Sequence, residues 1–435
     1  MTRSVFGQGR VARAAVVAIV VCSLVAGCVS APVVPQTRHQ ANLGRVAVVA
    51  GSQAPDISFK GFVHGKGEGA LAGGGVTFLT CSAGLASGMG GCAGPFCGAV
   101  VILWLGVCGV AGTVGTVVGA VSAPKKKEVR AAETTMRSAL DARVIQESLT
   151  HQVIAAAGDD SGLVALTMER EAEGVRDYRP LADAGIQTVL EVTLVKVGTE
   201  GGGINAPVQL VMRAHVRLVN TPDNREFFSA DYDYGGKRLK ITEWSADDGQ
   251  PLLQALQSGY AELGRHIHDN VFMLYPFPDR QAHMSGFLVA TFGLEPRYPG
   301  IRGQLSGDRL LGSHFEWIVV DSIRPVISWE AFPRTSDRKV APADMARASH
   351  VRYDLIIARE RNLAPDEVVY RREGLPEPRH QIETRLEPDT RYFWTVRARF
   401  MLDGRERVTE WGATHFMARD RMTVPSAWSY RFRTP

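Results

Sequence analysis

The dominant feature in the pattern of hydrophobic and polar residues is Gly69–Pro124, a stretch without one charged side chain. Gly94-Pro95 marks a turn near its middle and divides it into two arms, Ala70–Gly91 and Gly98–Val121. Each arm has about the twenty residues that a helix needs to cross a hydrocarbon core. The pattern therefore predicts an apolar helical hairpin that enters a membrane. A buried pair of soluble helices and a glycine-rich loop stay open as alternatives.

On both sides of this stretch the pattern is that of a soluble α/β protein. The apolar run Arg45–Ala50 predicts a strand with both faces covered. Apolar residues at helical spacing predict helices over Glu128–Ala157 and Leu252–Leu274. The inward stripe of the first is Met136, Leu140, Val144, Leu149 and Val153, and that of the second is Leu252, Leu256, Leu263, Ile267 and Val271. Three strands are predicted between the helices, at Thr188–Val197, Pro207–Asn220 and Arg225–Tyr234.

Residues 315–435 consist of short alternating runs that predict strands throughout, and the Pro- and Gly-rich residues 276–314 before them predict a linker. The predicted strands are Trp317–Val320, Val326–Ala331, Val351–Arg359, Glu367–Arg372, His380–Arg385, Arg391–Phe400 and Trp428–Arg433. The run Leu386–Tyr392, which continues into the alternating Trp394, Val396 and Ala398, resembles fibronectin type III domains. The resemblance implies a tyrosine corner, in which the Tyr392 ring packs inward and its hydroxyl bonds to upstream backbone.

The order strand, insertion, helix, three strands, helix over 45–275 is similar to the periplasmic α/β module of the curli-secretion lipoprotein. It is also similar to the N-terminal domain of the Tol-system propeller protein and to auxiliary lipoproteins of lipid-transport systems. We expect a multidomain chain with an α/β (α+β) periplasmic domain at 45–275, interrupted by the apolar hairpin at 69–124. The linker at 276–314 and an all-β fibronectin type III-like sandwich at 315–435 follow. The insertion is rich in glycine, so pore formation is not carried over from the curli protein.

The N-terminus has the parts of an export signal. Residues 1–27 contain a basic start and the apolar run Ala14–Val25, which is short for a membrane span. The sequence Leu24–Cys28 resembles the lipobox of bacterial lipoproteins, which implies that Cys28 becomes the acylated first residue, carrying palmitate or a similar chain. Val29 stands where an aspartate would indicate inner-membrane retention, which favours the outer membrane, and 28–44 are expected to be a tether. An ordinary signal with a chance cysteine, or an uncleaved anchor, is the alternative.

Glycine and cysteine spacing adds detail to the hairpin. Gly84/Gly88 and Gly115/Gly119 are G-x-x-x-G pairs, and they resemble the glycine-zipper hairpins of some bacterial outer-membrane lipoproteins. Four cysteines lie symmetrically about the turn, so that an antiparallel hairpin brings them together in nested pairs. The candidate disulfides are Cys81–Cys108 and Cys92–Cys97. Unpaired thiols in an apolar setting and a four-cysteine metal site stay open, although the spacing is not that of a zinc finger.

Charge identifies one further candidate site. Lys125, Lys126 and Lys127 directly follow the second arm, and a basic cluster at a membrane edge is attracted to anionic headgroups. The whole chain has 49 Lys and Arg residues against 45 Asp and Glu, a net charge of +4, which gives no indication of nucleic-acid binding.

Motifs for catalysis are weak. Gly61–Gly67 departs from the spacing of a phosphate loop, and His266 and His268 are too close in sequence to share one face of a helix. We expect no catalytic residue, no metal and no cofactor. The expected function is a non-enzymatic, lipid-anchored outer-membrane protein that faces the periplasm and supports envelope assembly, transport or secretion by binding partner proteins. A self-assembling glycine-zipper oligomer or channel component is the alternative, and an envelope enzyme is the third hypothesis.

Overall fold

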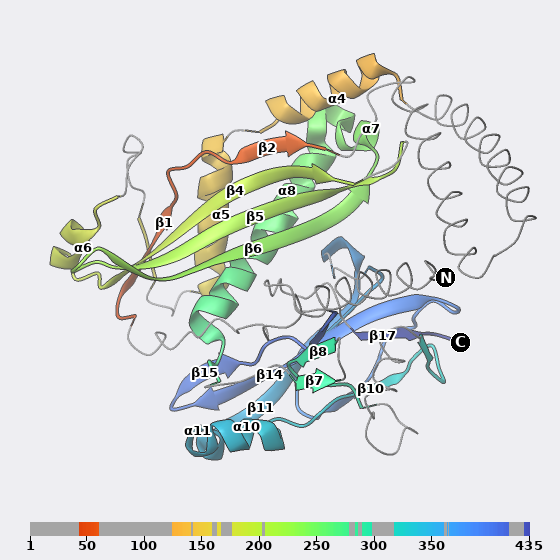
Figure 1. Ribbon diagram of the computed structural model, residues 1–435. Coiled ribbons are helices and arrows are strands. Elements are labelled where there is room, and N and C mark those ends of the chain that lie inside the picture. Colours follow the sequence, from red (N-terminus) through yellow and green to blue (C-terminus); the bar gives the residue numbers. More distant parts are fainter. Residues whose placement is uncertain are drawn as a thin grey trace, which may run out of the picture. The chain divides into compact units, whose positions relative to one another are not determined.

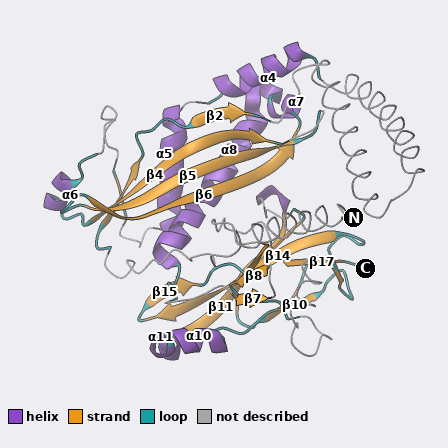
Figure 2. Ribbon diagram, viewed as in Figure 1, coloured by secondary structure: helices purple, strands orange, loops and turns teal. Residues whose placement is uncertain are grey.

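The computed structural model divides the chain into two compact units with separate cores. The first contains His39–Met273 with Ala364–Glu367, and the second contains Leu274–Leu363 with Val368–Pro435. The fold is mixed α/β with several sheets (Figures 1 and 2). The structure describes residues 43–60, 124–140, 142–158, 163–166, 176–201, 205–277, 283–285, 289–297, 317–360, 363, 365–416 and 430–435.

The first unit is built on a sheet with the order β3-β1-β4-β5-β6, in which β2 also pairs with β4. Strands β1, β2 and β3 run parallel to their neighbours, whereas β4, β5 and β6 form an antiparallel meander. The strands are β1 (Val46–Ala50), β2 (Asp56–Phe59), β3 (Val164–Ala165), β4 (Thr188–Glu200), β5 (Val208–Asn220) and β6 (Arg225–Leu239). The strands expected near 45, 188, 207 and 225 are therefore confirmed.

Helices cover one face of this sheet (Figure 1). They are α4 (Lys126–Ser138), α5 (Ala142–Ala157), α7 (Ile241–Trp244) and α8 (Ala246–His268), which continues into the π-helical turn η3 (Asp269–Met273); α6 (Arg179–Asp183) is a further short helix. The five residues expected to face inward on the last helix are all at most 2% exposed. At Gly264 a Cβ atom would lie 2.6 Å from the backbone carbonyl carbon of Gln152, so glycine allows α8 to approach α5 closely.

The expectation of one helix over Glu128–Ala157 is wrong, because α4 and α5 are separate helices. The first ends where the Ser138 hydroxyl donates a hydrogen bond to the Thr135 carbonyl oxygen, 2.9 Å away, and side-chain bonds of this kind compete with helix continuation. Val144, expected in the inward stripe, lies in the first turn of the second helix and is 56% exposed.

The second unit contains a sheet with the order β12-β11-β14-β17-β9, in which β15 pairs with β14, and a two-stranded sheet of β10 and β13. A third sheet has the order β16-β8-β7. The strands are β7 (His283–Ser285), β8 (Val289–Phe292), β9 (Ile318–Val319), β10 (Val326–Ser328), β11 (Ser349–Ala358), β12 (Val368–Leu375), β13 (Arg379–Gln381), β14 (Arg391–Leu402), β15 (Arg405–Val408), β16 (Ala413–Phe416) and β17 (Tyr430–Arg433). A 3-10 turn, η4 (Pro365–Glu367), separates β11 from β12 in the chain.

The expectation that 315–435 is all strand is wrong at one place, where α10 (Thr335–Val340) and α11 (Pro342–Arg347) follow each other. The Asp337 carboxylate accepts a hydrogen bond from the backbone N–H of Arg334 at 3.0 Å, which caps the first of these helices. Pro342 occupies the first position of the second, where its fixed φ favours a helix. Part of the segment expected as a linker also belongs to this unit, since Phe277 and Leu294 are buried in its core.

Among the described residues no helix combines the length and apolar character needed to span a membrane. Apart from Pro124, the apolar hairpin at 69–124 lies outside the described residues, as do the signal sequence and the tether up to Asn42.

Candidate functional site

The predicted site residues fall into two groups. Cys28 and the disulfide candidates Cys81, Cys92, Cys97 and Cys108 lie outside the described residues. The lysine cluster and Tyr392 are described, and they belong to separate units.

Lys125, Lys126 and Lys127 are all exposed at the beginning of α4. Lys125 precedes the helix, and its ammonium lies 3.3 Å from the Glu128 carboxylate in an exposed ion pair. Cations near a helix N-terminus are opposed by the helix macrodipole, which favours negative charge there. Helix stability therefore does not account for this cluster, and it remains available for an anionic surface.

Tyr392 is a core residue whose ring is 1% exposed and lies against Phe432, with ring centroids 5.5 Å apart. Its hydroxyl accepts a hydrogen bond from the backbone N–H of Glu387 at 2.9 Å. This contact closes the turn before β14 and fixes the direction in which that strand starts. The role of Tyr392 in the described structure is to shape the fold.

The first unit carries a row of charged and polar side chains on the sheet face opposite α5 and α8, which we call the polar sheet face. Its members come from three adjacent strands and alternate with buried apolar residues that point to the helices. They are Glu191, Thr193 and Lys196 on β4, Arg213, His215 and Arg217 on β5, and Asp231 and Asp233 on β6.

Ion pairs join the strands across this face. Arg213 pairs with Asp233, and the His215 ring nitrogen Nδ1 lies 2.8 Å from an Asp231 carboxylate oxygen. Arg217 donates to the Glu191 carboxylate on the other neighbouring strand at 2.8 Å. The side chains of the two β5–β6 pairs are between 27% and 41% exposed, so water reaches them.

One end of the polar sheet face is buried. The Tyr178 hydroxyl donates to the Glu191 carboxylate that Arg217 also contacts, and the Tyr178 ring is fully buried. Burial, together with the negative charge of Glu191, raises the pKa of Tyr178 above its usual value. The tyrosine therefore stays protonated and acts as a structural donor, not as a base.

The polar sheet face was not predicted, although its residues were assigned to the correct strands. The feature that could have predicted it is the cross-strand register of the β5–β6 hairpin. A bulge near Val219 shifts that register by one residue, and only the shifted register places Arg213 opposite Asp233 instead of opposite Tyr232. A hairpin drawn from its turn alone would not have paired these charges.

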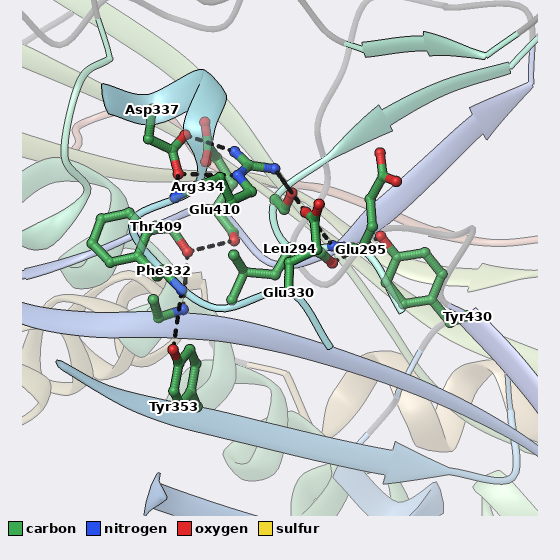
Figure 3. Close-up of polar contacts among 12 residues, drawn as sticks. Leu294, Glu295, Glu330, Phe332, Arg334, Asp337, Tyr353, Thr409, Glu410 and Tyr430 are labelled. Carbon is green, nitrogen blue, oxygen red and sulfur yellow. Dashed lines mark hydrogen bonds and ion pairs between the residues drawn. The ribbon is translucent and has the colours of Figure 1, made fainter. Parts of the chain in front are cut away.

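The second unit contains a buried acidic cluster around Arg334 (Figure 3). The guanidinium forms two hydrogen bonds with Asp337, at 3.0 and 2.9 Å, and lies 3.7 Å from Glu330. Burial raises the pKa of Glu330, and the nearby charge of Glu295 adds to the effect. Burial also raises the pKa of the Glu410 carboxyl to about 7, which Arg334 opposes only in part.

This cluster joins segments that are far apart in sequence. Arg334 also donates to the Gly293 carbonyl oxygen, and the Tyr430 hydroxyl donates to the Leu294 carbonyl at 3.0 Å (Figure 3). Because the Arg334 guanidinium contacts carboxyl groups and backbone of the same unit, the cluster holds Gly293 and Leu294, which precede β9 in the sequence, against the rest of the unit. Within the described residues no group of three or more His, Cys, Asp or Glu side chains is arranged to hold a metal.

Comparisons with known proteins identify no family. No protein-family model matches the sequence, and no curated protein matches it. A Xanthomonas campestris protein of the family DUF330 is 11% identical over 28% of this chain, with a TM-score of 0.20, and the match spans only 58% of that protein. The PelC dodecamer from Paraburkholderia phytofirmans is 11% identical over 28% of this chain and 74% of its own, with a TM-score of 0.18. The lipoprotein GNA1162 from Neisseria meningitidis is 18% identical over 27% of this chain and 85% of its own, also with a TM-score of 0.18.

Proposed function

We propose that this protein is a non-enzymatic, lipid-anchored protein of the outer membrane that binds partner proteins through the polar sheet face of its α/β unit. The observation that carries the proposal is the row of cross-strand ion pairs on the face that α4, α5, α7 and α8 leave open. Exposed ion pairs contribute little to folding stability, whereas an ordered pattern of charge gives specificity to an interface.

The anchor in this proposal is Cys28, with the apolar hairpin as a second contact. Strand β1 begins at Val46, so an extended tether would reach at most about 60 Å from the lipid. In the sequence the hairpin segment lies between β2 and α4, and these two elements touch through the Arg137 guanidinium, 5.9 Å from the centroid of the Phe59 ring. Two attachment points would hold the α/β unit near the membrane, where partners of the envelope are concentrated.

The C-terminal unit would be a fibronectin type III-like platform in this proposal. Support comes from the two sheets that share one core and from the Tyr392 contact at the start of β14. The two helices between β10 and β11 depart from a pure sandwich.

The test uses a photo-crosslinking amino acid in place of His215 in the full chain, expressed in its native envelope. We expect a distinct heteromeric adduct, and none from the same amino acid in place of Thr134, an exposed residue of α4. The double variant Arg213→Asp with Asp233→Arg keeps the cross-strand pair but reverses its direction, so it should fold normally and lose the adduct. A ladder of homomeric adducts instead would favour the self-assembling alternative, and an adduct that is insensitive to the swap would reject the polar sheet face.

Anchoring is tested separately with Cys28→Ala. We expect the mature wild-type chain to incorporate labelled palmitate and the variant to incorporate none. Equal labelling of the two proteins would contradict the lipid anchor, whatever the crosslinking shows.

A further inference from the structure

The second unit contains a cavity of about 300 Å³ that neither the polar sheet face nor the Arg334 cluster uses. It lies where β9 and β17 of the large sheet approach β10 of the two-stranded sheet. Its apolar walls are formed by Ile318, Val319, Val326, Ile327, Trp394 and Phe432. This volume is at the lower end of the range found for ligand sites, and it is large enough for one bulky side chain.

The mouth of the cavity is apolar as well. Val319 is 62% exposed and Val326 is 44% exposed, and both line the cavity. Across the described residues only one other large hydrophobic side chain, Val144 in the first unit, is exposed to a similar degree. Two exposed valines that flank an apolar cavity are a feature of the kind found at interaction sites.

Among the described residues, no strand pairs with the outer edge of β9. In the described part of its sheet β9 is the last strand, and it pairs in parallel with β17 on one side. The Val320 N–H extends this pairing by donating to the Arg433 carbonyl at 2.9 Å. An edge strand presents N–H and C=O groups to which an extended segment adds, and alternate side chains of that segment then point toward the same face.

Charges at the cavity indicate what kind of segment fits. Arg297 and Asp321, both exposed, line it with opposite charges. A fatty acid would satisfy the arginine only and would meet repulsion from the aspartate, whereas a polypeptide can carry both complementary charges.

We propose that β9 and this cavity bind an extended segment of a partner protein, which adds as a strand to the β9 edge. One aliphatic or aromatic side chain of the segment enters between Val319 and Val326. An acidic residue on one side of it meets Arg297, and a basic residue on the other side meets Asp321. This site is independent of the polar sheet face, so either one can fail while the other stands.

The experiment selects random nine-residue peptides displayed on phage against the full-length protein in detergent. We expect enriched peptides with one large apolar residue flanked by one acidic and one basic residue. The affinity of the best synthetic peptide should fall at least tenfold for Val319→Asp and for Val326→Trp, which fills the mouth. Val144→Asp is the matched control, an exposed valine in the other unit that should leave the affinity unchanged.

A second measurement separates strand addition from simple occupation of the cavity. Two versions of the peptide are N-methylated on alternate amides, one at the odd positions and the other at the even positions. Binding should be abolished in one version and kept in the other. Equal binding of both methylated peptides would overturn strand addition. Three results would overturn the proposal as a whole. They are a selection that enriches no peptide, an affinity that Val319→Asp leaves unchanged, and a cavity that binds decanoate but none of the peptides.

Discussion

The two units use charged strand residues in opposite ways. On the polar sheet face Arg213 and Asp233 pair while 39% and 27% exposed, whereas in the second unit Arg397 and Asp354 pair while 3% and 1% exposed. Asp354 also holds Arg399 at 3.0 Å, and the Arg397 guanidinium lies 4.5 Å from the centroid of the Trp411 ring. The difference in burial sets the strength of the electrostatic interaction in each pair, because water screens the first pair and is excluded from the second.

For this reason we assign partner binding to the exposed charges of the polar sheet face and fold stability to the buried ion pairs of the second unit. Removing one member of a buried pair leaves an uncompensated charge in the core, and the fold must retain it. Removing one member of an exposed pair costs little, so folding alone does not explain a row of them on one face.

The largest effect is expected for Asp354→Ala, which would remove the buried carboxylate that Arg397 and Arg399 both contact. We expect the second unit to lose about 3–5 kcal/mol of unfolding free energy. Hydrogen exchange of peptides from β11 and β14 measures this locally, which avoids assuming that the two units unfold together. The matched change on the polar sheet face, Asp233→Ala, should cost the first unit at most about 1 kcal/mol. Similar losses of unfolding free energy in the two units would contradict the difference that we expect between buried and exposed pairs.

The next effect is a pH dependence of the second unit caused by Glu410, whose folded pKa of about 7 lies above its ordinary value of 4.5. The folded state then holds the proton more tightly than the unfolded state does. Stability from this group is complete below the unfolded pKa and is lost as pH rises through the folded one, by about 3 kcal/mol in total.

Glu410→Gln imitates the protonated side chain and should remove this slope. At pH 8 the variant should be more stable than the wild type, and near pH 4 the two should be equal. Urea unfolding across that range, followed through hydrogen exchange of the second unit, checks it. Glu377→Gln, a change in an exposed pair with Arg379, is the control and should leave the pH curve unchanged. Parallel curves for wild type and Glu410→Gln would contradict the prediction.

These examples also separate what the sequence could predict from what it could not. The strands near 188, 207 and 225 and the inward stripe of α8 were predicted because long amphipathic elements repeat their signal over many residues. The break between α4 and α5 was missed because the apolar stripe continues across it, and the Ser138 hydroxyl bond at the end of α4 is not visible in that pattern. The short helices after β10 were missed because the interval between the strands predicted at Val326–Ala331 and Val351–Arg359 was given no element, although Pro342 within it is a helix-start signal.

The polar sites were harder to predict for a different reason. The Arg334 cluster combines residues from three distant segments, and no local spacing encodes their meeting. The polar sheet face depends on a single bulge that sets the register of β6 against β5. Tyr392, in contrast, makes its hydrogen bond to a residue only five positions away, so a local motif was sufficient to place it.

The smallest effect on stability, and a third use of charge, is expected at the lysine cluster. Lys126 and Lys127 oppose the dipole of α4, so Lys126→Glu with Lys127→Glu should stabilise the first unit by about 0.3–1 kcal/mol per site. The same change should weaken binding of the full chain to anionic vesicles by about 2 kcal/mol or more, since each lysine near such a surface contributes about 1 kcal/mol. Hydrogen exchange of α4 and co-sedimentation with phosphatidylglycerol vesicles measure the two quantities. Arg130→Glu, an exposed charge reversal one turn further along α4, is the control and should affect vesicle binding less. A stabilised helix with unchanged vesicle binding would separate the cluster from the membrane, whereas opposite changes in the two measurements would show that these lysines serve the surface at the expense of the helix.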